Sequence, residues 1–259
     1  MFNLLFIQIL LLEFGIWNLE FGIWNLEFGN TMATLYLLRH GQASFMSDNY
    51  DRLSDLGIEQ AKLLGQYFKE KEIQIDIAYT GTMERQKDTY LNFKKVYDGK
   101  IQMPQNIVLG ELNEHQFTEV FDDYRVGNPK LMTAIENASP QMKRKVVMKA
   151  FFRAYREWIT GKTGEGHESW EAFKLRVNRG FAEIEEALSR NETVAVFSSG
   201  GVISYMMGII MELKDQYSME LNWQIKNASI TEMNYSKGRF YLRGFNFVEH
   251  LGDDKVTFV

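Results

Sequence analysis

One stretch of the sequence places a nucleophile and an anion ligand together at the end of an apolar run. Leu35–Leu38 is followed directly by Arg39, His40 and Gly41. The apolar run predicts a buried strand, and the residues after it predict the loop at its carboxyl end, where open α/β sheets bind ligands. An imidazole can act as a nucleophile, and a guanidinium holds an oxyanion by paired hydrogen bonds. The stretch therefore predicts an anion site with a nucleophile.

Further polar groups follow other predicted elements. Arg85 lies in the first turn of a helix expected after the second strand, and Glu114 follows the third strand. Ser199 and Gly200 come directly after a late strand and open another helix. If these strands are parallel, their carboxyl ends share one edge of the sheet and the side chains converge. Two guanidiniums and the amides of a helix N-terminus suit a phosphoryl group, so we expect a phosphate ester as ligand.

The composition is that of an ordinary globular protein. The chain has 259 residues, of which 45% are hydrophobic and 24% are charged. Its net charge of −5 argues against general nucleic-acid binding. It contains no cysteine, which excludes disulfides, thiolate metal sites and a cysteine nucleophile. We expect a cytoplasmic protein that binds neither nucleic acid nor membrane; the sequence leaves its oligomeric state open.

The N-terminus carries a seven-residue repeat, because Leu12–Asn18 recurs as Leu19–Asn25. Its apolar residues alternate and a glycine recurs in each copy, which does not fit a coiled-coil heptad. The apolar segment before it, Phe2–Leu12, is shorter than the roughly 20 residues of a membrane-spanning helix. We expect residues 1–31 to be an extension outside the folded domain, and residues 32–259 to form that domain.

The apolar periodicity of the remaining chain alternates between strands and helices. After the first strand, strands are predicted over 73–80, 107–112 and 193–197, helices over 54–68, 82–97, 169–188 and 202–211, and a β-hairpin over 229–235 and 239–245. This alternation favours a three-layer α/β/α fold around a mostly parallel sheet. The C-terminal hairpin is expected at or near an edge of the sheet.

Residues 117–160 differ from the rest of the chain. They are polar, rich in Met and Lys, and interrupted by Pro129 and Pro140. We expect a helical, lid-like insertion beside the site, covering about 117–168. The basic run Lys143-Arg144-Lys145 is interpreted as a solvated face, with a substrate clamp as the alternative.

Five segments together resemble one family. They are, in chain order, Leu38–Gly41, Leu53–Ala61, Tyr79–Thr89, Leu112–Glu114 and Gly166–Val177. They resemble, in the same order, the motifs RHG, L-[ST]-x-x-G-x-x-Q-A, Y-S-S-P-L-x-R-A-x-x-T, L-x-E and G-E-S…R-V of the histidine phosphatase superfamily, in its phosphoglycerate mutase-like branch. A lone RHG is weak evidence, whereas five matches in order are specific.

The resemblance implies a role for each candidate residue. His40 would attack phosphorus and become phosphohistidine, while Arg39 and Arg85 would neutralise the phosphoryl oxygens. Glu114 would give a proton to the leaving oxygen and then take one from the attacking water. The resemblance implies neither a metal nor another cofactor. Glu111, three residues before Glu114, is the alternative for the acid.

The match departs from the family at one position of the phosphate site. The family reads S-H-G-G after the late strand, and its second histidine contacts the phosphoryl group. Here the segment is Ser198-Ser199-Gly200-Gly201, so Ser199 takes the place of that histidine. We still expect Ser199 and Gly200 to bind phosphate, but loss of one transition-state donor can cost about 10²–10³-fold in rate. The other histidines, His115, His167 and His250, are expected to be structural or at the surface.

Three functions remain after this reading of the sequence. The first is a phosphoric monoester hydrolase acting on a small phosphorylated substrate or a phosphoprotein. The second is a phosphoglycerate mutase-type phosphotransferase, which would need a second phosphate site under the insertion. The third is a phosphoester-binding module with weakened catalysis, motivated by Ser199.

Overall fold

The computed structural model describes residues 32–44, 51–162 and 167–258. Strands β1 to β6 cover Ala33–Arg39, Ile77–Thr80, Asn106–Val108, Thr193–Ser198, Ile230–Ser236 and Arg239–Phe247. Helices α2 to α9 cover Asp55–Glu70, Glu84–Tyr97, Phe117–Gly127, Pro129–Glu136, Pro140–Ile159, Trp170–Ser189, Gly200–Ile210 and Asp215–Leu221. The expected N-terminal extension, residues 1–31, and Gly166 lie outside the described residues.

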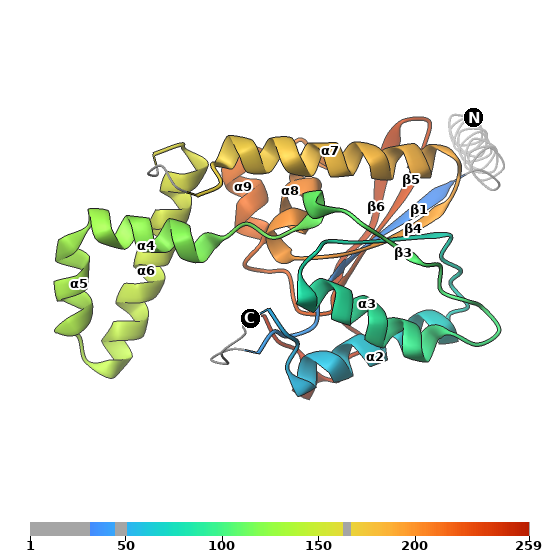
Figure 1. Cartoon of the computed structure of the whole chain (residues 1–259), viewed down its shortest axis with the longest axis horizontal. Coiled ribbons are helices and arrows are strands. Elements are labelled where there is room, and N and C mark those ends of the chain that lie inside the picture. Colours follow the sequence, from blue (N-terminus) through green and yellow to red (C-terminus); the bar gives the residue numbers. More distant parts are fainter. Residues whose placement is uncertain (1–31, 45–50, 163–166, 259) are drawn as a thin grey trace, which may run out of the picture.

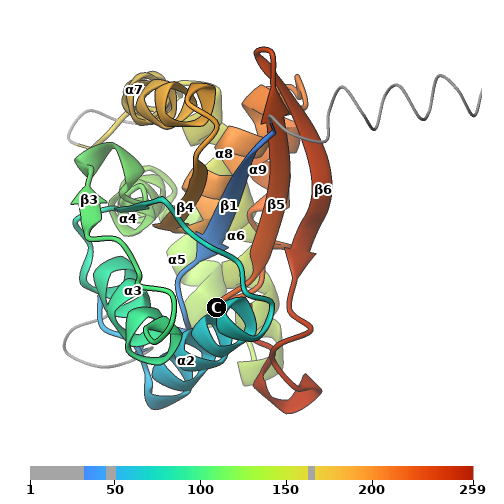
Figure 2. The same ribbon diagram turned by 90° about the vertical axis from the view of Figure 1, so that its right-hand side faces the viewer.

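The strands form one sheet in the order β3-β2-β4-β1-β5-β6. β1 pairs in parallel with β4, and β2 pairs in parallel with both β4 and β3. β5 runs antiparallel to β1 and β6 antiparallel to β5, so the C-terminal hairpin forms one edge of the sheet (Figure 2). This confirms the mostly parallel sheet and the edge hairpin.

Helices cover both faces of the sheet because the side chains of β1 alternate between two apolar clusters. Leu35 and Leu37 pack in the cluster that contains residues of α7, α8 and α9. Tyr36 and Leu38 pack in the other cluster, with residues of α2 and α3. Figure 1 shows α7 on one side of the strands and α2 with α3 on the other. The predicted three-layer α/β/α fold is therefore confirmed.

The strand predicted over 107–112 is wrong in its second half. β3 ends at Val108, and the chain then turns through a 3₁₀ helix, Gly110–Leu112. The amide of Leu112 donates to the main-chain oxygen of Leu109 at 3.1 Å, which closes the turn. Leu112 is fully buried in this turn, so its apolar side chain reflects burial in the core rather than an extended backbone.

The start of β2 and the presence of α9 also differ from the prediction. β2 begins at Ile77, four residues after the predicted start of that strand at Ile73. The short helix α9 was not predicted at all; it follows α8 and buries only Ser218 and Met219. A buried face of one serine and one methionine is too small to produce a clear apolar period.

α4, α5 and α6 form a helical arm beside the α/β body (Figure 1). Pro129 and Pro140 stand at the starts of α5 and α6, where a helix has no use for the missing N–H. The end of α6 returns to the body, where Trp158 Nε1 donates to the main-chain oxygen of Glu168 at 2.8 Å. In the described part of the chain, none of the helices combines the length and apolar character needed to cross a membrane.

Candidate active site

His40 lies directly beyond the carboxyl end of β1. Its amide donates to the main-chain oxygen of Ser198 at 2.9 Å, which continues the β1–β4 pairing by one residue. The backbone after it runs close to α2, where a Cβ on Gly41 would collide with the main-chain oxygen of Gly57. Gly41 and Gly57, the glycines of the first two motifs, are therefore both needed for the close approach of these two backbone segments.

The imidazole of His40 is held in one orientation. Nδ1 lies 2.7 Å from the main-chain oxygen of Gly41, which can only accept, so Nδ1 carries the proton. Nε2 then has a lone pair, and it accepts a hydrogen bond from Arg85 Nε at 3.1 Å. The side chain is buried, and burial, followed by the charges of Arg85 and Arg39, lowers the pKa of His40 well below its ordinary value. The ring is thus neutral near pH 7 and presents Nε2 as its basic atom.

Arg85 is fixed in the first turn of α3. Its Nη1 donates to Asp51 Oδ1 at 2.7 Å, and the other carboxylate oxygen of Asp51 accepts from the amide of Glu84 at 2.8 Å. One carboxylate therefore holds both the guanidinium and the start of its helix. Thr89 joins α3 to the histidine loop, because its hydroxyl donates to Arg85 O at 2.7 Å and accepts from Gly41 N at 3.1 Å. Sequence analysis did not single out Asp51 as a site residue.

Arg39 comes from the last position of β1 and lies beside the start of α8. A Cβ on Gly200 would lie 3.6 Å from Arg39 Nε. Nη1 donates to the main-chain oxygen of Phe258 at 2.7 Å and to that of Ile225. The structure thus brings Arg39, Gly200 and His40 together, and it attaches the arginine to the C-terminal segment.

Glu114 reaches the same edge of the sheet from the turn after β3. Its Oε2 accepts from the amide of Gly201 at 2.9 Å, and its Oε1 lies 2.7 Å from His115 Nδ1 and 3.1 Å from His115 N. A Cβ on Gly201 would collide with Oε1, so a larger residue there would displace the carboxylate. Burial by itself raises the pKa of Glu114, but His115, the Gly201 amide and Arg85 outweigh it and lower the pKa to about 2.

The alternative acid, Glu111, points elsewhere. Its side chain is 34% exposed and lies 3.9 Å from Arg179 Nε of α7. Arg176 braces this turn: its Nη1 donates to the main-chain oxygens of Glu111 and Asn113, both at 2.9 Å. Arg176 also forms a bidentate ion pair with Glu168, in which Nε and Nη2 each donate to one carboxylate oxygen at 2.7 Å. The geometry brings Glu114 toward Arg85 and leaves Glu111 at the surface.

Ser199 is fully buried at the N-terminus of α8. Its hydroxyl accepts a hydrogen bond from Gln86 Nε2 at 2.9 Å, and the same nitrogen donates to Leu112 O at 3.0 Å. Sequence analysis missed Gln86, although the family motif quoted above has alanine at this position. The glutamine in place of the motif's alanine was the signal that could have identified this residue. The two residues that depart from the family motifs, Gln86 and Ser199, contact each other.

The remaining histidines have different surroundings. His115 is buried against Glu114, so its expected structural role needs to be extended. His167 Nδ1 lies 2.8 Å from Asp123 Oδ2, and the ring of His250 packs on Tyr67 with centroids 5.7 Å apart. These two histidines therefore lie apart from the arrangement around His40.

Fold and site together define an α/β protein with a buried histidine, two arginines and a carboxylate at the carboxyl edge of its parallel strands. The chain belongs to the histidine phosphatase superfamily, branch 1, whose family model matches residues 35–248. A 2,3-bisphosphoglycerate-dependent phosphoglycerate mutase of Staphylococcus carnosus is 39% identical over 66 residues, which are 23% of this chain and 29% of that protein. The match thus spans less than a third of this relative.

Solved structures share the fold at low identity. Phosphoglycerate mutase from Bacillus anthracis is 21% identical with a TM-score of 0.57, covering 85% of this chain and 95% of that one. The YhfR protein of Bacillus stearothermophilus is 19% identical with a TM-score of 0.61, covering 84% and 98%. The alpha-ribazole phosphatase of Shigella flexneri is 19% identical with a TM-score of 0.56, covering 83% and 96%.

Proposed function

We propose that the protein is a phosphoric monoester hydrolase that works through a phosphohistidine on His40. The observation that carries the proposal is the contact between His40 Nε2 and Arg85 Nε at 3.1 Å, with Nδ1 tied to Gly41 O. This arrangement keeps a neutral nucleophile beside a permanent positive charge. The relatives named above include a phosphatase and two mutases, which supports a phosphoryl-transfer enzyme.

In the first step a phosphoryl group would enter between His40 and the arginines. The Nε2 lone pair forms the N–P bond as the bond from phosphorus to the ester oxygen breaks. Arg85 and Arg39 turn their N–H groups to the phosphoryl oxygens, where negative charge spreads in the transition state. Glu114 gives its proton to the leaving oxygen, which departs as an alcohol.

Glu114 can supply that proton only if its pKa rises when substrate binds. In the free protein its pKa is about 2, so the carboxylate is ionised near pH 7. A phosphate dianion beside it neutralises Arg85 and repels the carboxylate, and both effects raise the pKa of Glu114. Glu114 therefore takes up a proton from solvent when the substrate dianion binds, and it carries none in the free protein near pH 7.

In the second step water attacks the phosphohistidine and the N–P bond breaks. Glu114 takes a proton from that water, so inorganic phosphate leaves and His40 regains its Nε2 lone pair. Ser199 and Gly200 would support both steps from the start of α8. The Ser199 hydroxyl accepts from Gln86, which leaves its own hydrogen for a phosphoryl oxygen.

Two observations favour other outcomes for the same site. The local 39% identity to a phosphoglycerate mutase favours phosphoryl transfer between two positions of a phosphorylated acid. The serine at position 199 favours a phosphoester-binding module of low turnover. Hydrolysis of small phosphate esters or phosphoproteins is preferred over the binding module because His40, both arginines and Glu114 are present together.

The three functions separate in one set of assays with p-nitrophenyl phosphate and with 2- and 3-phosphoglycerate, using wild type and His40→Ala. The proposal predicts phosphate release by wild type and none by the variant. Interconversion of the phosphoglycerates without phosphate release would establish the mutase instead. No turnover, with phosphate still raising the melting temperature, would establish the binding module.

A further inference from the structure

His115 makes the most direct contact with the acid of the site. Its Nδ1 lies 2.7 Å from Glu114 Oε1, and the same oxygen accepts from the His115 amide at 3.1 Å. The other carboxylate oxygen is held by Gly201 N at 2.9 Å. Two of the N–H groups that the described residues place against the Glu114 carboxylate therefore belong to His115, and both meet the same oxygen.

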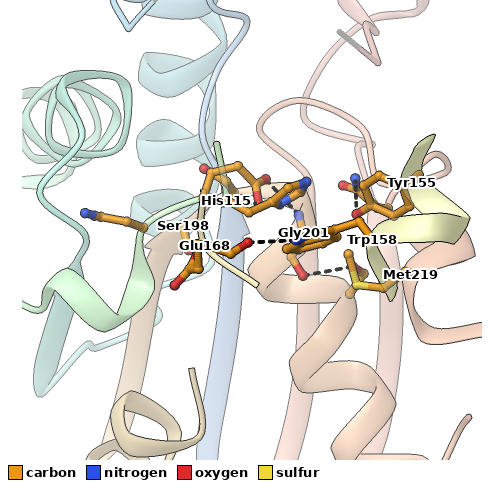
Figure 3. Close-up of polar contacts among 12 residues, drawn as sticks. His115, Tyr155, Trp158, Glu168, Ser198, Gly201 and Met219 are labelled. Carbon is orange, nitrogen blue, oxygen red and sulfur yellow. Dashed lines mark hydrogen bonds and ion pairs between the residues drawn. The ribbon is translucent and has the colours of Figure 1, made fainter. Parts of the chain in front are cut away.

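The ring of His115 lies in an aromatic cage. It stacks on Trp158 at a centroid distance of 4.6 Å and an angle of 18°. Phe117, Tyr155 and Phe173 meet it edge-on at 5.4 to 5.7 Å. Figure 3 shows His115 with Tyr155 and Trp158 of α6 on one side and Gly201 of α8 nearby. The last helix of the arm thus holds the imidazole from the side away from the sheet.

The cage presents Nδ1 of the imidazole to Glu114. Nδ1 lies 2.7 Å from Glu114 Oε1, whereas the buried Nε2 has no hydrogen-bond partner among the residues that the structure describes. The stacked ring of Trp158 holds the imidazole in this orientation. His115 therefore acts on Glu114 as a donor that the cage keeps in place.

We infer that His115 is a positioning residue for the general acid: its Nδ1–H holds the Glu114 carboxyl toward the reacting group. The inference rests on the proposed phosphoryl transfer and deepens it. By stabilising the ionised carboxylate, the donor also sets the pH above which the acid has lost its proton. The arm then affects catalysis by holding the imidazole with Trp158 and Tyr155.

The other titratable and charged groups near the pair act on it in known directions. Arg85, from α3, lowers the pKa of Glu114, and the neutral His40 adds no charge in the free protein. Tyr155, from α6, is buried with its pKa raised well above the ordinary value, so it stays neutral. Phe117, Trp158 and Phe173 do not titrate. Substitution of His115 therefore removes its donor to Glu114 while Arg85, His40 and Tyr155 remain in the protein.

Two substitutions separate the donor from the ring. His115→Asn places an amide N–H near the position of Nδ1 but loses the stacked ring, and His115→Phe keeps a stacked ring but loses the donor. The positioning role predicts that kcat falls about tenfold or more in His115→Phe and less than about threefold in His115→Asn. The alkaline limb of the kcat–pH profile should move to higher pH only in His115→Phe, because the acid then keeps its proton longer.

A role in packing alone predicts the opposite order, with the asparagine variant the slower and the less stable. That order, or unchanged pH limbs in both variants, would overturn the inference. Melting temperatures verify folding, and His115→Leu replaces His115→Phe if the latter does not fold. A carboxyl ¹³C NMR titration, with the Glu114 signal assigned from Glu114→Gln, measures the pKa of Glu114 directly. It therefore tests the His115–Glu114 contact without relying on enzyme activity. A raised Glu114 pKa in His115→Phe supports the inference even if wild type hydrolyses nothing, whereas an unchanged pKa contradicts it.

Discussion

Arg85 Nε donates its hydrogen bond to the basic nitrogen of His40, at 3.1 Å, rather than to a carboxylate. Asp51 takes the other side of Arg85 at 2.7 Å, so the guanidinium is held even when nothing is bound. The site is thus built before substrate arrives, which reduces reorganisation in the transition state.

Arg85→Lys tests that prebuilt geometry. A lysine keeps the charge but loses the planar fork that meets both His40 and Asp51. We predict a fall of about 10²–10³-fold in kcat with p-nitrophenyl phosphate, measured by steady-state kinetics. Arg179→Ala is the matched control, since Arg179 is largely exposed on α7 and should leave kcat unchanged. Equal losses in both variants would show that general charge, and not this contact, matters.

The pH dependence of kcat/KM reports the free histidine. Burial, with Arg85 and Arg39, lowers the pKa of His40, so the nucleophile stays neutral until the pH falls well below the ordinary histidine value of 6.5. We predict no acid limb from His40 near pH 6.5 in wild type. Arg85→Ala removes one of the charges that lower the pKa of His40. On the acid side of the profile, the residual kcat/KM of this variant should therefore begin to fall at a higher pH than that of wild type. If the acid limb of kcat/KM lies at the same pH in wild type and in Arg85→Ala, the charge of Arg85 is not what lowers the pKa of His40.

Glu114→Gln tests the assignment of the acid. An alkoxide needs a proton as it leaves, whereas p-nitrophenolate leaves readily without one. We predict a loss of about 10²–10⁴-fold with an alkyl phosphate and a much smaller loss with p-nitrophenyl phosphate. Glu111→Gln, three residues earlier and at the surface, should behave like wild type with both substrates. If Glu111→Gln shows the leaving-group effect instead, the acid has been misassigned.

Ser199 and Gln86 should act as a pair, because the two buried side chains are joined at 2.9 Å. In Ser199→His the imidazole would enter space that Gln86 fills, so we predict a slower and less stable enzyme than wild type. Ser199→His combined with Gln86→Ala should recover both activity and melting temperature relative to the single variant. A single Ser199→His variant that is faster than wild type would show that the serine is a defect.

The regular parts of the fold follow from local sequence, whereas the finer parts of the site depend on distant contacts. Ser54 and Ser169 are serines before amphipathic runs, and both accept hydrogen bonds from amides of the helices they precede. The strand prediction failed at Leu112, because a buried apolar residue in a 3₁₀ turn cannot be distinguished by its hydrophobicity from one in a strand. The continuous apolar run from Leu35 to Leu38 correctly predicted a buried strand, because both faces of the sheet are covered.

The candidate site was predictable where motifs fall at strand ends, and not where side chains meet across the fold. Arg39, His40 and Arg85 lie together as expected, since parallel strands bring their carboxyl ends to one edge. Gln86 was missed, and His115 was given only a structural or surface role, because their contacts depend on side-chain rotamers that the sequence does not show. Gln86 meets Ser199, 113 residues later, and no local period records such a pair.

The central claim is that phosphate passes through His40, and trapping the intermediate tests it most directly. Wild type and His40→Ala would be mixed with p-nitrophenyl phosphate, quenched in alkali within the first turnover and digested for mass spectrometry. The account predicts one phosphoryl group on the peptide that contains His40 in wild type, at a level matching a burst of p-nitrophenol, and neither signal in the variant. Hydrolysis by wild type with no phosphorylated His40 peptide, or a burst that survives in His40→Ala, would contradict it.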